Sequence, residues 1–323
     1  MMDFCILGSG VSGSTIANLL SKKYSVHVFD KARGSGGRSS NKKLKNNLSF
    51  DHGLQYISPK DKDFSKFIQK LIKKKILKSW NGNHLDFSFE KKKISPKIIG
   101  KKANNDLSKY LLKNIKKSFS SPIIRIEYKK KIWKITLKNK IFYEFKRLII
   151  TCPYPQLKKL SKKYLDKRIL NLKIKMQPNI TVMIAIKGKS NSLISSIKFN
   201  DDILAWAAYE NSKNRFKSNI NLWTLQASLK WSIDKINKYK SNNKVINELI
   251  SRFLKLTGYK KNRIIFTKVH GWKYSYSYNS TNMKCLWNKK YQLGVCGDWF
   301  LGPKVEHAWI SAVSLFQEIH KKT

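Results

Sequence analysis

Residues 4–38 read FCILGSGVSGSTIANLLSKKYSVHVFDKARGSGGR, and this stretch decides the fold. It contains a short apolar strand, a Gly-rich turn, an amphipathic helix and a second strand, in that order. Gly8 and Gly10 permit a tight turn and bring the backbone close to a bound pyrophosphate, while Gly13 lets the helix pack against the strand. The helix N-terminus would face the phosphates with its free N–H groups. The stretch therefore predicts a βαβ unit that binds a dinucleotide.

An acidic residue follows the second strand at the spacing that nucleotide binding requires. Asp30 closes the strand Val26–Phe29 and lies 20 residues after Gly10, where a carboxylate accepts hydrogen bonds from ribose hydroxyls. A second Gly-rich turn at residues 34–37 then ends at Arg38, which adds donors for a pyrophosphate. The plain nicotinamide fingerprint lacks this second turn, so the extension bears on which dinucleotide is bound.

Lysine dominates the charge of the chain. Among 323 residues, 67 are Lys or Arg and 19 are Asp or Glu, which gives a formal net charge of +48. Nucleic-acid binders usually gather charge in a stripe or tail, whereas these lysines are spread along the chain beside many Ile and Asn residues. We attribute most of the charge to A/T-rich codons and expect no specific nucleic-acid partner, although non-specific polyanion binding at low salt would follow. A positive field would also steer a phosphate-bearing substrate.

The cysteines and the apolar runs bear on the compartment. Cys5, Cys152, Cys285 and Cys296 show no metal-binding or redox spacing, so we expect reduced thiols, no metal site and a cytoplasmic setting. The first strand begins almost at Met1, so no cleavable signal is expected before it. No apolar run approaches the roughly 18 residues of a membrane-spanning helix.

Apolar spacing predicts the elements that follow. Helical spacing covers residues 61–78, 105–119 and 245–254. Three short β-rich runs within residues 123–145 predict a meander, which leads into a buried strand at residues 147–152. The length suits one large domain or two interleaved domains.

Two segments near the N-terminus resemble a known family. DKARGSGGR, residues 30–38, resembles the acid and Gly-Gly-Arg segment of the flavin amine oxidase superfamily, whose members bind FAD. LSFDHGLQYIS, residues 48–58, resembles the Asp-x-Gly-x-Gln-Tyr segment that runs beside the flavin ring in that superfamily. The resemblance implies non-covalent FAD as the cofactor.

The C-terminal segment LGVCGDWFLGPKVEHAWISA resembles the Gly-Asp and Glu-x-Ala segment of the same superfamily. Asp298 would bond the ribityl or phosphate groups, and the helix after Pro303 would direct its dipole at the flavin ring. Two positions depart from the family pattern, because His307 and Ala312 stand where glycine is common. These departures bear on the substrate more than on the cofactor.

The motifs and the resemblance together assign a set of residues to the cofactor, with Ile123 lying over the adenine through its backbone. The set is Gly8, Ser9, Gly10, Ser12, Gly13, Asp30, Lys31, Gly37, Arg38, Gln55, Tyr56, Ile123, Gly297, Asp298, Val305, Glu306 and Ala308.

Two further segments resemble the renalase-like branch of the superfamily. LQASLKWS, residues 225–232, is followed by HGWKYS, residues 270–275, and in that branch such segments shape the cap and its substrate cavity. The predicted cavity residues are Tyr56, Trp231, Trp272, Tyr274, Trp299 and His307.

The resemblance implies an α/β fold with an α+β cap. A Rossmann-like FAD-binding domain of the glutathione-reductase/p-hydroxybenzoate-hydroxylase type would comprise residues 1–60, 97–158 and 266–323. A substrate cap of mixed β-sheet and helices would comprise residues 61–96 and 159–265.

For function, the resemblance implies a FAD-dependent oxidase. Renalase-like enzymes take hydride from mis-reduced NAD(P)H isomers to flavin N5, and O2 reoxidises the flavin with release of hydrogen peroxide. The expected partners are a phosphate-bearing dihydronicotinamide and O2, with a monomer or homodimer as the oligomeric state. An amine oxidase or a desaturase-type enzyme on a lipophilic substrate is the alternative. A non-catalytic basic flavoprotein that binds nucleic acid is a second one.

Overall fold

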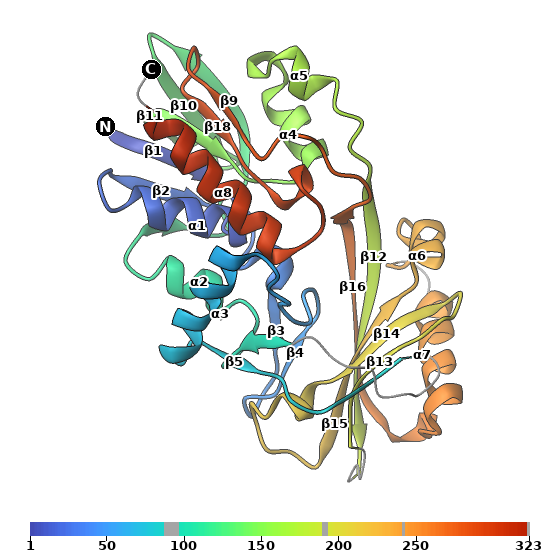
Figure 1. Ribbon diagram of the computed structural model, residues 1–323. Coiled ribbons are helices and arrows are strands. Elements are labelled where there is room, and N and C mark those ends of the chain that lie inside the picture. The colour runs from blue at the N-terminus through green and yellow to red at the C-terminus, as the bar shows by residue number, and fades with distance from the viewer. Residues whose placement is uncertain (87–96, 189–192, 241–242, 322–323) are drawn as a thin grey trace.

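The computed structural model describes residues 1–86, 97–188, 193–240 and 243–321. The chain forms two lobes, each built on its own β-sheet (Figure 1). Residues 87–96, part of the predicted first cap segment, lie outside the described residues.

The first lobe has a mixed eight-stranded sheet in the order β17-β18-β11-β1-β2-β8, extended from β11 by β10 and β9. The pairs joining β18, β11, β1, β2 and β8 are parallel, and the remaining pairs are antiparallel. The strands are β1 (Met2–Leu7), β2 (Val26–Phe29), β8 (Lys116–Ser118), β9 (Ile123–Lys129), β10 (Ile132–Leu137), β11 (Phe142–Ile150), β17 (Leu286–Asn288) and β18 (Leu293–Val295).

Both faces of this sheet are covered, which explains the continuous apolar run of β1. Phe4 and Ile6 point into a core shared with α1 (Val11–Leu20) and α8 (Val305–His320). Cys5 and Leu7 point the other way, into a core completed by the β9-β10-β11 meander and α4 (Tyr154–Ser161). The short helices α3 (Asp106–Leu111) and α5 (Lys167–Leu170) complete this lobe.

The second lobe has a six-stranded sheet in the order β16-β12-β15-β14-β13-β6, antiparallel except for the β13-β6 pair. Strands β12 and β16 are long and run from this lobe into the first (Figure 1). The strands are β6 (Asn83–Leu85), β12 (Met176–Lys187), β13 (Ile194–Lys198), β14 (Leu204–Tyr209), β15 (Ile220–Ala227) and β16 (Ile264–Ser277).

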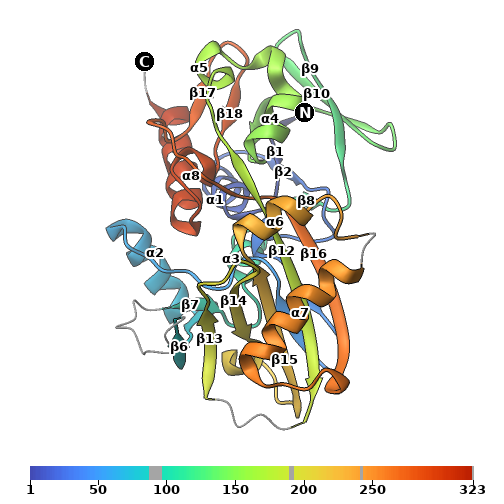
Figure 2. The same ribbon diagram turned by 90° about the vertical axis from the view of Figure 1, so that its right-hand side faces the viewer.

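Alternation along β12 explains how the six-stranded sheet of the second lobe packs; we call this lobe the cap and its sheet the cap sheet. Val182 and Ile184 face helices α6 (Leu229–Lys235) and α7 (Asn243–Thr257), which cover one side of the sheet (Figure 2). Met183 and Ala185 face the opposite side and pack on Phe50 of the first lobe. The cap sheet therefore turns one face toward its own helices and the other toward the β3-β4 segment of the first lobe.

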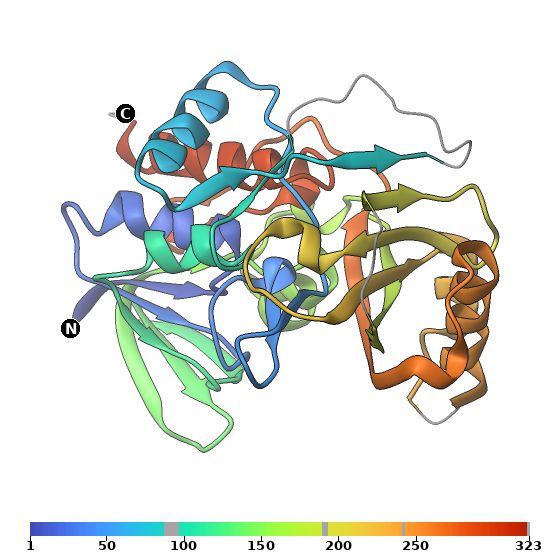
Figure 3. The ribbon, with the colours of Figure 1, turned by 90° about the horizontal axis from the view of Figure 1, so that it is seen from below.

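Two small antiparallel sheets and one helix lie between the lobes. The first sheet is the hairpin of β3 (Asn41–Lys43) and β4 (Ser49–Asp51), and the second pairs β5 (Leu77–Ser79) with β7 (Ile98–Gly100), with β6 between them in the sequence. Helix α2 (Lys62–Lys73) lies beside α8 (Figure 3), where the Phe64 and Trp309 ring centres are 5.5 Å apart.

Two predicted helices are shorter than their apolar spacing indicates. Helix α2 ends before Lys75, whose φ of 56° is left-handed and cannot continue an α-helix. The predicted helix at residues 105–119 ends at Leu111, because Lys116–Ser118 pair with β2 as an edge strand. Pairing with a distant strand overrides local spacing here. The predicted meander, the last strand and the C-terminal helix are confirmed.

Candidate functional site

The two glycine turns meet at the N-terminus of α1. Gly36 N–H donates to the Ser9 carbonyl at 3.0 Å. A Cβ on Gly13 would lie 1.9 Å from the Gly8 carbonyl oxygen, so only glycine allows this packing of helix on turn. A Cβ on Gly10 would instead have its nearest neighbours, in the second turn, 4.0 Å away. The space beside Gly10 is open, and it is bordered by both turns.

The donors at this opening suit a phosphate. No side chain caps α1 at Gly10, so the first N–H groups of the helix are available to an anion. Ser12 Oγ donates to the Ala308 carbonyl at 3.0 Å, which brings the first turn of α8 against the first turn of α1. Both helices therefore begin at the same place. An open cradle with helix-end donors fits a dinucleotide pyrophosphate.

Asp30 organises the first turn. Its Oδ2 accepts from Ser9 N–H at 2.8 Å and from Ser9 Oγ at 2.6 Å, and its Oδ1 accepts from Ala32 N–H at 2.8 Å. The carboxylate holds the loop shape and keeps acceptor capacity for further hydroxyl groups. Lys31 next to it is exposed.

Arg38 joins both lobes. Its guanidinium pairs with Asp298 Oδ1 at 2.6 Å and donates to the Ser275 carbonyl of β16 at 2.8 Å. Two residues predicted to bind the cofactor therefore lie in direct contact. Gly37, one residue before Arg38, has a φ of 52° and closes the second turn.

The start of α8 is fixed by Glu306. Its Oε2 accepts from the backbone N–H groups of Lys60 and Asp61 at 2.6 and 2.7 Å, directly before α2. His307 lies in the first turn of α8, and its Nδ1 is 3.0 Å from the Gly302 carbonyl oxygen in the turn before the helix. Val305 packs with the apolar cluster under α2.

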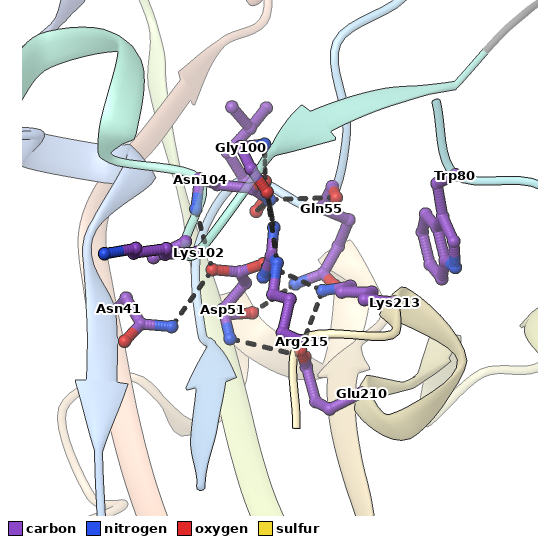
Figure 4. A network of polar contacts seen from close by, with 12 residues as sticks. Asn41, Asp51, Gln55, Trp80, Gly100, Lys102, Asn104, Glu210, Lys213 and Arg215 are labelled. Carbon is purple, nitrogen blue, oxygen red and sulfur yellow. Dashed lines mark hydrogen bonds and ion pairs between the residues drawn. The ribbon is translucent and has the colours of Figure 1, made fainter. Parts of the chain in front are cut away.

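A buried cluster of four charges joins β4 to the cap (Figure 4). Asp51 pairs with Lys213 at 3.0 Å and with Arg215, and Lys213 also pairs with Glu210 at 2.8 Å. All four side chains are at most 3% exposed. Lys213 Nζ also lies 5.1 Å from the centre of the Trp80 ring. The two cations balance the two carboxylates, which is what allows burial.

The two carboxyl groups of this cluster differ. Burial acts to raise the pKa of Asp51, but Lys213 and Arg215 outweigh it and hold that pKa below its usual range. For Glu210, burial outweighs the attraction of Lys213 and raises the pKa. Of the two carboxyl groups, Asp51 is therefore the one held more strongly in its ionised form.

Gln55 turns its side chain toward this cluster. Its Nε2 donates to the carbonyls of Asp51 and Gly53 at 2.5 and 3.2 Å, and its Oε1 lies 3.4 Å from Lys213 Nζ. The amide is thus engaged within the protein. Any contact of Gln55 with a cofactor would therefore come through its backbone and not through its side chain.

Two predicted cavity residues are wrong. Trp299 has no exposed surface, because it packs in the core of the first lobe, where its ring stacks on Phe300. Trp231 is buried in the cap core against α7. Apolar spacing cannot tell a core tryptophan from a cavity wall, because both lie on an inward face.

The other predicted aromatic residues lie where the lobes meet or on β16. Trp272 stacks on His52 and donates from Nε1 to the His52 carbonyl at 2.8 Å. Tyr56 lies 5.9 Å from Trp206 of β14, measured between ring centres. Tyr274 follows on β16, with Lys273 Nζ 6.0 Å from its ring centre. Ile123 begins β9.

Some residues at the site were missed by sequence analysis. They are Lys97 and Trp206 beside Tyr56, and Glu210, Lys213 and Arg215 in the charge cluster. Alternation within LAWAAY, residues 204–209, could have placed Trp206 and Ala208 on one face. Glu210 and Lys213 have the i,i+3 spacing of many ion pairs. In a chain with 67 basic residues, however, the same spacing often arises without an ion pair.

His52 gives the protein an expected acid sensitivity. Burial, followed by the nearby His270, lowers the pKa of His52 to about 4. Between this pKa and the usual pKa of about 6.5, His52 binds a proton in the unfolded chain and not in the folded one. The stability of the fold should therefore fall as pH drops from about 6.5 to about 4. The loss is on the order of 2–3 kcal/mol. A His52→Phe variant, measured by denaturant unfolding at several pH values, should have a shallower slope over this range. An unchanged slope would exclude His52 as a source of it.

Within the described ranges, no group of three or more His, Cys, Asp or Glu side chains could hold a metal ion. None of the helices within the same ranges is long and apolar enough to cross a membrane.

The fold and the paired glycine turns define a Rossmann-like dinucleotide-binding architecture. A family model described as an NAD(P)-binding Rossmann-like domain matches residues 6–71. Solved structures extend the likeness over both lobes. A candidate protoporphyrinogen oxidase from Exiguobacterium sp. 255-15 has a TM-score of 0.73 and 9% identity, with 98% of each chain covered.

Two further structures share the architecture. Wild-type putrescine oxidase bound to putrescine has a TM-score of 0.70 and 11% identity, with 98% of each chain covered. A protein from Pyrococcus furiosus has a TM-score of 0.67 and 13% identity, covering 100% of this chain and 98% of that one. At such low identities, the likeness defines the fold and leaves the reaction to the residues of the site.

Proposed function

We propose that this chain is an FAD-dependent oxidase of the flavin amine oxidase type, and that its substrates are mis-reduced NAD(P)H isomers, as in renalase-like enzymes. The observation that carries the cofactor assignment is the open cradle between the two glycine turns at the uncapped start of α1. The two-lobed likeness to oxidases supports the reaction class.

The residues around the cradle would hold FAD in distinct ways. The first turn of α1 would donate to the pyrophosphate, and Asp30 would accept from the ribose hydroxyls. Arg38 and Asp298 lie in direct contact, so both would reach the cofactor from the same position. Each would then give up part of the ion pair between them. The start of α8 would place its positive dipole end near the ring. When bound, FAD would accept hydride from the substrate and pass the electrons to O2.

The substrate assignment rests on the groups that the site offers. A dihydropyridine gives up hydride as it becomes aromatic, so its oxidation requires no strong base. His52 and His270 are weak bases, because burial lowers the pKa of each. Weak bases are sufficient for a reaction of this kind. In the net reaction, a dihydronicotinamide isomer, O2 and a proton give NAD(P)+ and hydrogen peroxide. The chain's part is to orient the ring and exclude water.

An amine substrate is less well supported by the charges. A polyamine such as putrescine needs carboxylates to hold its ammonium groups. Asp51 and Glu210, the acids buried between the lobes, are paired with Lys213 and Arg215. The net charge of +48 also repels cations.

The test is a visible spectrum recorded before and after anaerobic mixing with NADH isomers. We expect the purified protein to show an oxidised-flavin spectrum that the isomers bleach and that ordinary NADH leaves unchanged. Readmitted air should restore the spectrum with release of hydrogen peroxide. A flavin spectrum bleached by putrescine or another amine would favour the alternative, and a protein unable to bind flavin would refute the proposal.

A further inference from the structure

Lys97, Tyr56 and Trp206 come together where the first lobe meets the cap sheet. Lys97 Nζ lies 4.9 Å from the centre of the Tyr56 ring, and the Tyr56 and Trp206 rings are 5.9 Å apart. Tyr56 follows β4, Lys97 directly precedes β7, and Trp206 lies on β14. We call these three residues the Lys97 subsite.

Backbone hydrogen bonds fix the position of this subsite. Ile57 and Ile98 exchange N–H···O bonds of 2.7 and 2.9 Å, and Trp80 N–H donates to the Lys97 carbonyl at 2.7 Å. Buried Trp80 and Ile99 form an apolar cluster with Ala208, and Tyr56 and Trp206 pack against it. The three side chains therefore stand on a rigid base.

Two donors of the subsite lack acceptors. Trp206 Nε1 is buried and has no hydrogen-bond partner in the structure. Within the described ranges, the contact found for Lys97 Nζ is the Tyr56 ring and no carboxylate pairs with it, and burial lowers the pKa of this ammonium group. A half-buried ammonium without a counter-charge and a buried N–H without an acceptor both cost free energy. A ligand with anionic oxygens would satisfy both.

We propose that the Lys97 subsite binds the phosphate-bearing part of a nicotinamide nucleotide, with Lys97 pairing with a phosphate. Trp206 Nε1 donates to an oxygen of the same ligand, and the Tyr56 ring packs against it. This inference rests on the proposed function, since it names the residues that select the substrate. The same lysine repels an ammonium group, so the subsite excludes polyamines.

Neighbouring charges do not reverse this selection. The four-charge cluster meets Trp80 through Lys213, whose Nζ lies 5.1 Å from the centre of the Trp80 ring. Its two carboxylates are matched by two cations, so it presents no net negative charge to a ligand. Lys97 then sets the sign of the charge at the subsite.

The test measures binding of nicotinamide mononucleotide to the oxidised, FAD-loaded protein by calorimetry. Lys97→Gln should weaken binding about tenfold or more, because a charge-assisted contact is lost. Trp206→Phe should weaken it about two- to tenfold, since it removes one N–H and keeps an aromatic ring. The control is Lys60→Gln, which changes an exposed lysine near Tyr56 in sequence and should leave the affinity unchanged.

A second measurement does not depend on the variants folding. The unaltered protein should bind nicotinamide mononucleotide about tenfold or more tightly than nicotinamide riboside, which lacks the phosphate, and added salt should reduce this difference. Equal affinity for the two ligands would overturn the inference. So would a Lys97→Gln variant that folds, retains flavin and binds as tightly as the unaltered protein.

The two proposals can fail separately. If NADH isomers bleach the flavin with the same KM in the Lys97→Gln and unaltered proteins, the reaction stands and the subsite is refuted. If nicotinamide mononucleotide binding depends on Lys97 but no isomer bleaches the flavin, the subsite stands and the reaction is refuted.

Discussion

A Gly10→Ala variant is expected to fold normally and to bind FAD weakly. Gly10 has φ −68°, which alanine adopts without strain, and the added methyl group would find its nearest protein atoms 4.0 Å away. It would instead occupy the cradle that a pyrophosphate must enter. Overpacking of this kind costs about 1–3 kcal/mol, so FAD affinity should fall by roughly 5- to 150-fold.

Two matched glycine variants complete this experiment. Gly34→Ala adds a methyl group that meets no protein atom within 4 Å, so it should leave the stability of the protein unchanged. Gly13→Ala should lower the melting temperature of the protein without cofactor, because its Cβ would overlap the Gly8 carbonyl. Flavin fluorescence titration gives the affinity, and thermal unfolding without flavin gives the stability. Normal FAD affinity in Gly10→Ala would place the cofactor elsewhere.

The Lys213→Met variant is expected to lose about 3–5 kcal/mol of unfolding free energy. The lysine is fully buried between Asp51 and Glu210, and methionine fills a similar volume without the charge. The variant leaves two buried carboxylates with Arg215 as their remaining partner. Urea unfolding at neutral pH measures the loss.

Two further variants separate charge from packing. Lys163→Met removes an exposed lysine whose Nζ lies 4.9 Å from the centre of the Tyr164 ring, and it should change stability by less than about 1 kcal/mol. Adding Glu210→Gln to Lys213→Met restores charge balance, so the double variant should recover about 1 kcal/mol or more. Strictly additive losses would mean that Lys213 stabilises the protein through packing alone.

The fold was predictable where function and structure demand the same residues. The glycine turn of residues 8–13 must be tight for helix packing and open for a phosphate, and this double demand leaves a recognisable spacing. The meander and the C-terminal helix were also predicted, since each has a clear apolar period. Lys116–Ser118 was missed because its strand character comes from pairing with β2.

The site was less predictable because it is assembled by tertiary contacts. Lys97 is one of many lysines, and its place beside Tyr56 follows from the Ile57 and Ile98 backbone bridge. Trp299 and Trp231 were assigned to the cavity, yet they fill two separate cores. An apolar period in the sequence shows which residues face inward. Whether such a residue packs in a core or lines a binding site depends on how much of its surface the neighbouring lobe covers.

The strand order of the first lobe has a consequence for synthesis of the chain. Strand β1 is flanked by β2 and β11, and β11 in turn by β18, which is complete only at Val295. The core over α1 also requires Leu315 of α8. A ribosome therefore delivers the first glycine turn early, but the lobe around it can close only after α8 has emerged. Five of the six cap strands lie within residues 176–277, so most of the cap sheet can pair before β17, β18 and α8 of the first lobe have emerged.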